Sequence, residues 1–291
     1  MYRHQAWEDK FSFHELKQED SLLRVVPARG GIITEWVVGG QPVLYLDRET
    51  LMDTSQNIRG GIPILFPICG TLQDGQYRWE NNHYRMKQHG LARNLPWEVT
   101  QMEVGDREAS LTLETASNPD TRLAFPFDFR LVFSYILKAD SLTIKQRYIN
   151  RSDTDMPFYA GFHPYFYAPD RRAVRLNIPA ATGSCRNLLT GTVEPFSGVL
   201  NLEGVTEANY VLDKLSGNRV SFGNFGTGRE VVLEFAGEFK YIVLWVLEGK
   251  DFVCVEPWMA DNYALNTGKG LHKLGPGEWL ETWVSLTVRP E

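Results

Sequence analysis

Apolar and polar residues alternate with a period of two along much of this chain. The stretches Ser110–Glu114 and Ser141–Lys145 follow this pattern, and residues 279–288 continue it. The longer stretch Arg130–Leu137 is rich in aromatic and β-branched residues, which are common in strands. Alternation of this kind is typical of strands with one buried and one exposed face.

Two other stretches, Tyr241–Leu247 and Phe252–Val255, are apolar at almost every position. Such runs suit strands that are covered on both faces. Residues Glu248–Asp251 between them carry a turn signal, so the pair is predicted to form a hairpin. The chain shows no long stretch with the apolar spacing of a helix, and only Asp47–Thr54 favours a short one.

Turn signals such as Asn118-Pro119 recur throughout, and there is no low-complexity linker or fixed-period repeat. With 291 residues, 43% of them hydrophobic, the chain is long enough to bury a large core. The pattern therefore predicts a single all-β domain, residues 1–291, built from two large, mainly antiparallel packed sheets.

Unusual chemistry is concentrated between Asn57 and Trp97. Arg59 precedes two glycines, which adopt positive φ easily and leave room beside the arginine for a bulky anion. The apolar run Ile62–Pro67 contains prolines, which indicates an edge or irregular segment. His89 and Arg93 follow after a polar, hairpin-like insert. Polar side chains on turn-rich backbone beside apolar anchors are typical of a concave binding site.

Two further residues are candidates for acid–base chemistry. His163 lies in the aromatic stretch Phe158–Phe166, and Glu256 ends an apolar strand just before Pro257-Trp258. Burial would raise the pKa of such a carboxyl group and make it a base near neutral pH. The competing interpretations are that His163 is a hydrogen-bonded core or surface residue and that the chain reaches the surface at Glu256.

Composition and motifs exclude several classes of function. A net charge of −6 argues against a nucleic-acid partner, and no apolar stretch approaches the length of a membrane span. The charged N-terminal residues do not resemble a signal peptide, and three widely spaced cysteines suit free thiols in the cytoplasm. Cys254 is predicted to be a small buried hydrophobe. Known metal, serine-nucleophile and phosphate-loop motifs are missing, so no cofactor or metal is expected.

Four motifs taken together resemble the aldose 1-epimerase (galactose mutarotase-like) superfamily. They are Asn57-Ile-Arg-Gly-Gly-Ile-Pro63, Gln88-His-Gly-Leu-Ala-Arg93, Gly161-Phe-His-Pro-Tyr165 and Val255-Glu-Pro257, and their order and spacing match from about residue 20 onward. The first two are most similar to the glucose-6-phosphate 1-epimerase branch. The resemblance implies a β-supersandwich and an isomerase of carbohydrate metabolism that interconverts the α and β anomers of a hexose or hexose 6-phosphate.

The same resemblance implies roles for single residues. Glu256 falls on the catalytic base and His163 on the catalytic acid, and the two are expected on opposite sides of one sugar. Arg59, His89 and Arg93 fall on substrate-binding positions. Aromatic residues such as Trp245, Trp258 or Tyr165 are candidates for stacking on the sugar, with core packing as the competing interpretation.

Some questions stay open at this level. Relatives hold sugar hydroxyls with an aspartate that has no secure counterpart here, the nearest matches being Glu207 and Asp213. The main alternative function is a non-catalytic sugar-binding or regulatory protein. A glycoside hydrolase or lyase would need a second carboxylate opposite Glu256, which no motif supplies. The expected partner is a small sugar or sugar phosphate, and the expected state is a monomer or weak homodimer.

Overall fold

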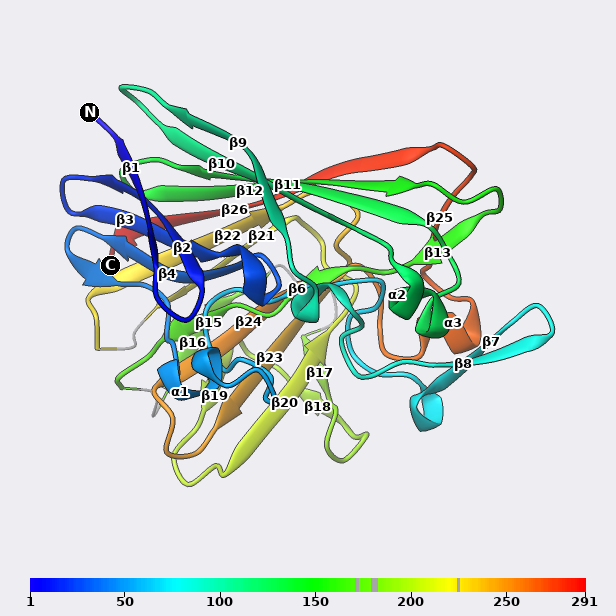
Figure 1. Cartoon of the computed structure of the whole chain (residues 1–291). Coiled ribbons are helices and arrows are strands. Elements are labelled where there is room, and N and C mark those ends of the chain that lie inside the picture. Colours follow the sequence, from blue (N-terminus) through cyan, green and yellow to red (C-terminus); the bar gives the residue numbers. More distant parts are fainter. Residues whose placement is uncertain (171–172, 179–182, 224–225) are drawn as a thin grey trace.

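The computed structural model describes residues 1–170, 173–178, 183–223 and 226–291. Strands dominate it, arranged as two large sheets, a five-stranded sheet and two small pairs (Figure 1). Figure 1 shows β9–β12 and β26 running across the top of the molecule, with β17, β20, β23 and β24 in the layer below. The predicted all-β architecture of packed antiparallel sheets is therefore confirmed.

The larger sheet has nine strands, and one of its interior strands shows why the alternating pattern is typical of strands. In β11, buried residues alternate strictly with half-buried ones, because one face packs against the core. The sheet order is β19 (Val199–Asn201), β16 (Ala173–Asn177), β21 (Arg219–Gly223), β22 (Arg229–Phe235), β26 (Trp279–Pro290), β12 (Ser141–Asn150), β11 (Phe129–Leu137), β10 (Ala109–Ala116) and β9 (Glu98–Val104).

The second large sheet has eight strands and carries the two continuous apolar runs as its centre. The hairpin predicted from these runs is present as β23 and β24, and every residue of β24 is buried. The order is β18 (Val193–Pro195), β17 (Ser184–Asn187), β20 (Glu207–Leu212), β23 (Tyr241–Leu247), β24 (Phe252–Trp258), β14 (Gly161–Phe162) and β6 (Ile64–Leu65), with β15 (Tyr165–Tyr167) also paired to β24.

The five-stranded sheet is formed by the first part of the chain and lies at the left of Figure 1. It consists of β1 (Arg3–Glu8), β2 (Ser12–Gln18), β3 (Ser21–Val26), β4 (Ile32–Val38) and β5 (Gln41–Pro42). The small pairs are β13 (Met156–Phe158) with β25 (His272–Leu274), and β7 (Gln76–Trp79) with β8 (Asn82–Arg85). The β7–β8 pair is the polar hairpin that the sequence predicted, and it projects at the right of Figure 1.

The described residues contain three short α-helices, none of them long and apolar enough to cross a membrane. Helix α1 (Arg48–Met52) begins where the sequence predicted a short helix, since the Asp47 side chain accepts a hydrogen bond from the Thr50 amide. The others are α2 (Pro119–Ala124) and α3 (Ala264–Thr267), and 3₁₀ turns lie at Pro27–Arg29, Gln73–Gly75 and Ala92–Asn94.

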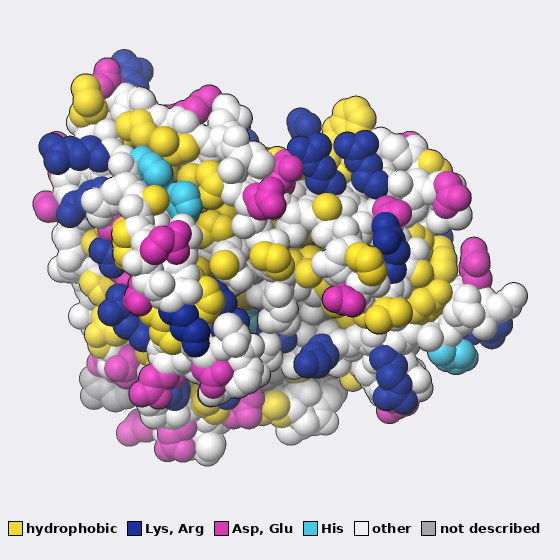
Figure 2. Space-filling view, in the orientation of Figure 1, with side chains coloured by type: hydrophobic (Ala, Val, Ile, Leu, Met, Phe, Trp, Pro, Cys, Tyr) yellow, Lys and Arg dark blue, Asp and Glu magenta, His cyan; other side chains and the backbone are white. Residues whose placement is uncertain are grey.

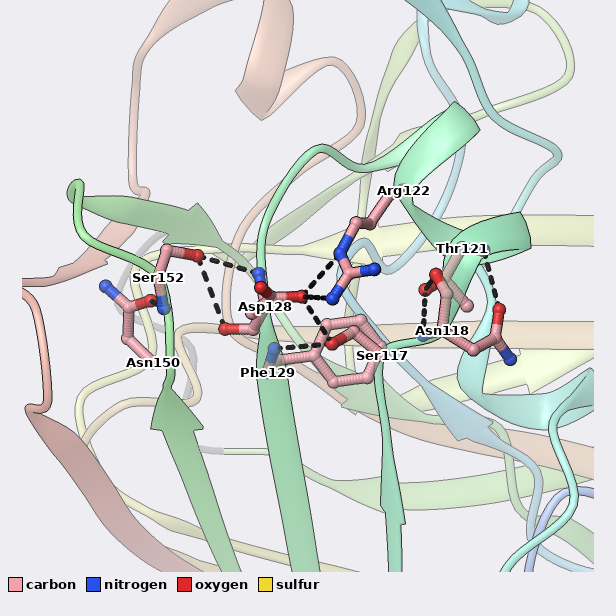
Figure 3. Close-up of polar contacts among 8 residues, drawn as sticks. All are labelled: Ser117, Asn118, Thr121, Arg122, Asp128, Phe129, Asn150 and Ser152. Atoms are coloured by element: carbon pink, nitrogen blue, oxygen red, sulfur yellow. Dashed lines mark hydrogen bonds and ion pairs between the residues drawn. The ribbon is translucent and has the colours of Figure 1, made fainter.

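Helix α2 corrects the interpretation of Asn118-Pro119 as a simple turn. Asn118 caps the helix, and its side chain and that of Thr121 bond each other's backbone amides in a capping box (Figure 3). Figure 3 also shows Asp128, which directly precedes β11. Its carboxylate accepts hydrogen bonds from the side chains of Ser117 and Arg122. These bonds tie the helix to the strand that follows it.

The sequence motifs around residues 57–67 are anchored between the sheets. The run Ile62–Pro67 contains β6 (Ile64–Leu65) at the edge of the eight-stranded sheet, and the edge position agrees with its prolines. Phe66 packs against Phe129 and Tyr148 of the other large sheet, with ring centroids 4.9 and 5.7 Å apart. Because these rings are buried on both sides, the loops that flank β6 start from a rigid base.

The two glycines after Arg59 do not leave room for a ligand, so that prediction is wrong. A Cβ at Gly60 would lie 2.5 Å from the Cα of Leu46, and one at Gly61 would lie 2.1 Å from the carbonyl oxygen of Ile33. The φ angle of Gly61 is +63°. The glycines are required because the loop passes directly against neighbouring backbone.

We expect Gly61→Ala to lower the free energy of unfolding by about 1–3 kcal/mol, because it adds both a steric overlap and a strained φ. Gly39→Ala is the matched control, since Gly39 also has a positive φ but nothing lies within 4 Å of its would-be Cβ. Chemical denaturation of both variants measures the difference. Equal losses in the two variants would contradict a role for the close approach at Gly61.

Charged side chains of both signs are interspersed over the face of the molecule shown in Figure 2. Apolar side chains also reach this face, mostly in small groups between the charged ones. This distribution agrees with the modest net charge of −6.

Candidate active site

One face of the eight-stranded sheet forms the floor of a pocket. Cys254 of β24 lies opposite Tyr165 of β15 on one side and Trp245 of β23 on the other. Residues opposite each other in a sheet share a face, and so do alternate residues along a strand. Glu256 and Trp258 are therefore presented on the same face as these three side chains.

Two loops form the walls of this pocket, which has a volume of about 300 Å³. The first contains Arg59, whose carbonyl oxygen accepts a hydrogen bond from the Asp47 amide. The second contains residues 88–93 and is fixed by hydrogen bonds from the amides of Leu91 and Ala92 to the Phe66 carbonyl oxygen. The structure brings all five residues named from the sequence to the lining of this one pocket: Arg59, His89, Arg93, His163 and Glu256.

His163 and Glu256 are neighbours at the floor of the pocket. The Nε2 atom of His163 lies 3.4 Å from Oε1 of Glu256, and only 1% of the glutamate is exposed. The expectation that they lie on opposite sides of a sugar is therefore wrong. The alternative that the chain surfaces at Glu256 is also wrong, because β24 continues to Trp258.

The strand continues past Pro257 because this proline falls where no ladder bond is needed. On the side of β24 that faces β14 and β15, pairing involves residues 252–254 and then Trp258. The segment His163-Pro164 interrupts the neighbouring strands between these two points. A missing N–H at Pro257 therefore costs no sheet hydrogen bond, and Glu256 stays within the sheet.

Burial controls the ionisation of this pair. It raises the pKa of Glu256 well above its usual range, and the indole N–H of Trp258 opposes this shift. Burial also lowers the pKa of His163 to about 3, with the charge of Arg93 acting in the same direction. Both shifts favour the uncharged form of each group, because the pocket floor gives little solvation to a charge.

His89 is held in one defined tautomer. Its Nδ1 atom accepts a hydrogen bond of 3.0 Å from the Gly70 amide, so in the neutral ring the proton lies on Nε2. Burial lowers the pKa of His89 well below its usual range, and nearby His163 and Arg93 add to the effect. The ring packs edge to face against His163 with centroids 5.4 Å apart. His89 is thus a neutral hydrogen-bond donor inside the pocket.

The two arginines differ in how firmly they are held. Arg59 is exposed, whereas Arg93 is half-buried and donates one hydrogen bond of 2.9 Å to the Gln88 carbonyl oxygen. The Nε atom of Arg93 is buried and has no hydrogen-bond partner among the described residues. A buried guanidinium N–H without a partner is costly, so this group is suited to a polar or anionic ligand.

A family model also matches nearly the whole length of this chain. Residues 13–287 match the family model described as aldose 1-epimerase. This chain belongs to the aldose 1-epimerase family.

Two solved structures and one curated protein are similar to this chain. The Slr1438 protein from Synechocystis sp. PCC 6803 is 40% identical, with a TM-score of 0.90 over 100% of this chain and 96% of that one. A galactose mutarotase-like protein from Clostridium acetobutylicum, 18% identical, has the same fold, with a TM-score of 0.82 over 100% of this chain and 99% of its own. A Salmonella typhimurium protein with a provisional glucose-6-phosphate 1-epimerase name is 35% identical over 106 residues, which are 36% of this chain and 33% of that protein.

In this member of the aldose 1-epimerase family, the structure also settles which mid-chain polar residues reach the pocket. Glu207 and Asn209 of β20 line it, whereas Asp213, which is exposed beyond the end of β20, is not part of the lining. The Oδ1 atom of Asn209 is buried without a partner among the described residues. The sequence analysis did not name Asn209 as a site residue. Alternation could have indicated it, because residues 207 and 209 share one face of their strand.

The pocket floor also gathers three side chains of types that bind metal ions. One side-chain nitrogen, sulfur or oxygen atom from each of His163, Cys254 and Glu256 lies within 4.8 Å of the others. Burial raises the pKa of the Cys254 thiol well above its usual range, and Glu256 adds to the effect. Cys254 is thus held as an uncharged thiol under the pocket floor, which agrees with its prediction as a small buried hydrophobe.

Proposed function

We propose that this protein is an aldose 1-epimerase that interconverts the α and β anomers of a hexose or hexose 6-phosphate. The observation that carries the proposal is the buried pair of His163 and Glu256, 3.4 Å apart on the floor of a pocket of about 300 Å³. Family membership supports a sugar isomerase, and the pair supplies the two proton-transfer groups that anomer exchange needs.

The reaction follows from where these two groups lie. Glu256 removes the proton from the anomeric hydroxyl while His163 delivers one to the ring oxygen, which breaks the bond between that oxygen and C1. The open-chain aldehyde rotates, and reversal of the two transfers closes the ring on the other face. The anomeric hydroxyl oxygen and the ring oxygen are both bonded to C1, so an acid and a base that act on them must be neighbours. His163 and Glu256 are neighbours in this sense.

The pair needs one proton between its two members. The active arrangement has that proton on His163 and a carboxylate at Glu256, whereas burial favours the proton on Glu256. The contact of 3.4 Å gives the proton a short path between the two groups. We propose that His89, Glu207 and Asn209 hold the sugar hydroxyls, His89 as a donor through Nε2 and Asn209 as an acceptor through Oδ1.

We further propose that the preferred substrate carries a 6-phosphate. C6 of a hexose is attached to C5, which is bonded to the ring oxygen, so a phosphate there lies on the side of the sugar that faces His163. Arg93 is close enough to lower the pKa of His163, and its Nε–H lacks a protein partner. Arg59 lines the same pocket and adds a second guanidinium.

Exchange spectroscopy by NMR tests the function directly. Saturation of the α-anomer signal should transfer to the β anomer in the presence of catalytic amounts of protein, first with glucose 6-phosphate and then with glucose and galactose. Binding of these sugars without any increase in exchange would instead support a non-catalytic sugar-binding protein. Faster exchange of unphosphorylated sugars would contradict the phosphosugar preference but not the epimerase activity.

A further inference from the structure

The second oxygen of Glu256 has its own partner. While Oε1 faces His163, Oε2 accepts a hydrogen bond of 3.0 Å from the indole Nε1–H of Trp258. Both residues lie on the same face of β24, two positions apart. Among the described residues, this indole is the side chain that donates a hydrogen bond to the carboxyl group.

The indole of Trp258 is held in a slot with little freedom to move. A Cβ at Gly70 would lie 2.8 Å from Cζ3 of the indole, and one at Gly161 would lie 2.9 Å from its Cδ1. The ring of His89 packs edge to face against it with centroids 5.7 Å apart. Only 3% of Trp258 is exposed. The two glycines therefore fix the direction in which the N–H points.

We propose that Trp258 is a positioning residue that orients Glu256 and biases the proton pair toward carboxylate and imidazolium. An N–H bonded to a carboxylate stabilises the charged form, so the indole counteracts the effect of burial. This role differs from stacking on the sugar, which the sequence suggested for Trp258. The inference rests on the proposed function, because it assigns the carboxylate form to the active state.

Other ionisable groups near Glu256 do not replace this hydrogen bond. His163 contacts the other oxygen, and Arg93 influences His163 and Tyr165. Burial and Glu256 both raise the pKa of Cys69. They also raise the pKa of Cys254, which lies on β24 with Glu256, so both thiols stay uncharged. The pKa of Tyr165 is also raised, chiefly by burial. The indole N–H of Trp258 therefore stabilises the carboxylate form of Glu256 through a direct hydrogen bond.

Trp258→Phe tests the inference, because phenylalanine keeps an aromatic ring in the slot and removes the N–H. The C=O stretch of protonated Glu256, identified by its loss in Glu256→Gln, reports the protonation of this carboxyl group by difference infrared spectroscopy. We expect its titration to move to higher pH by about one to two units, and kcat to fall more than KM changes. Trp283→Phe is the control for a tryptophan-to-phenylalanine change, since Trp283 is exposed on the nine-stranded sheet, away from the pocket lining, and should leave the titration unmoved.

A second measurement keeps the shape of the side chain. Replacing tryptophan by 5-fluorotryptophan makes the indole N–H a stronger donor, so the Glu256 titration should move to lower pH. In the Trp258→Phe variant the same replacement should leave the titration unmoved. An unmoved titration in both experiments would overturn the proposal. A rise in KM with unchanged kcat and titration would overturn it in favour of sugar stacking. If the unaltered protein shows no anomer exchange, the proposed function fails, while the infrared titration still decides the role of Trp258.

Discussion

Glu256→Gln should lower kcat for anomer exchange by about 10²–10⁴-fold, because the amide cannot accept the proton of the anomeric hydroxyl. His163→Asn should cause a loss of the same order by removing the proton donor for the ring oxygen. Saturation-transfer NMR at saturating sugar measures both effects. Near-normal exchange in either folded variant would show that the 3.4 Å pair is not the proton-transfer pair.

The glutamine variant should fold at least as well as the original protein. Burial raises the pKa of Glu256 in the folded state above its value in the unfolded chain. The folded state therefore binds the proton more tightly, and stability decreases as pH rises from the unfolded pKa to the folded one. Glutamine removes this dependence, so thermal unfolding near neutral pH should show no loss of stability.

Glu207→Gln is the control for the loss of kcat in Glu256→Gln. Glu207 is an exposed carboxylate of the same pocket, and its replacement should alter KM more than kcat.

Arg93→Ala should remove most of the preference for a phosphorylated sugar. A hydrogen bond between a guanidinium and a phosphate is charge-assisted, so its loss should lower kcat/KM for glucose 6-phosphate by about 10- to 100-fold. Unphosphorylated glucose should be affected much less. Steady-state kinetics with both sugars measures the ratio, and Arg59→Ala should show the same direction with a smaller change because Arg59 is exposed.

Arg147→Ala is the matched control for this series. Arg147 forms an ion pair with Glu281 on the outer face of the nine-stranded sheet, away from the pocket lining. Its loss should leave the ratio of the two kcat/KM values unchanged. If Arg93→Ala lowers activity on glucose and glucose 6-phosphate equally, Arg93 does not bind a phosphate and the substrate proposal is wrong. The assignment of His163 and Glu256 would survive that result.

Local patterns in the sequence were sufficient to predict the architecture. Alternation identified β10, β12 and β26, because each has one face in the core. Richness in aromatic and β-branched residues identified β11. Continuous apolar runs with a turn between them identified the β23–β24 hairpin, because both strands are central in their sheet. The motifs then named five residues that the fold brings to one pocket, although they are as far apart in the chain as Arg59 and Glu256.

What the sequence could not predict depends on contacts between distant segments. The room beside Gly60 and Gly61 is occupied by Leu46 and Ile33, which no local pattern places there. The extension of β24 through Pro257 depends on a gap in the neighbouring strands. A proline signals a strand end in isolation, and only the tertiary pairing shows that its missing N–H is not needed.

The candidate site also has features that the sequence indicates and features that depend on tertiary packing. Residue types and motifs were enough to name the candidate acid, base and cationic groups. The contact between His163 and Glu256, the tautomer of His89 set by Gly70, and the hydrogen bond from Trp258 to the second carboxylate oxygen depend on how distant segments pack. The positions of Glu256 and Trp258 depend on strand register, since a shift of one residue in the register of β24 would turn both side chains to the opposite face of the sheet. The tautomer of His89 depends instead on the packing of two loops.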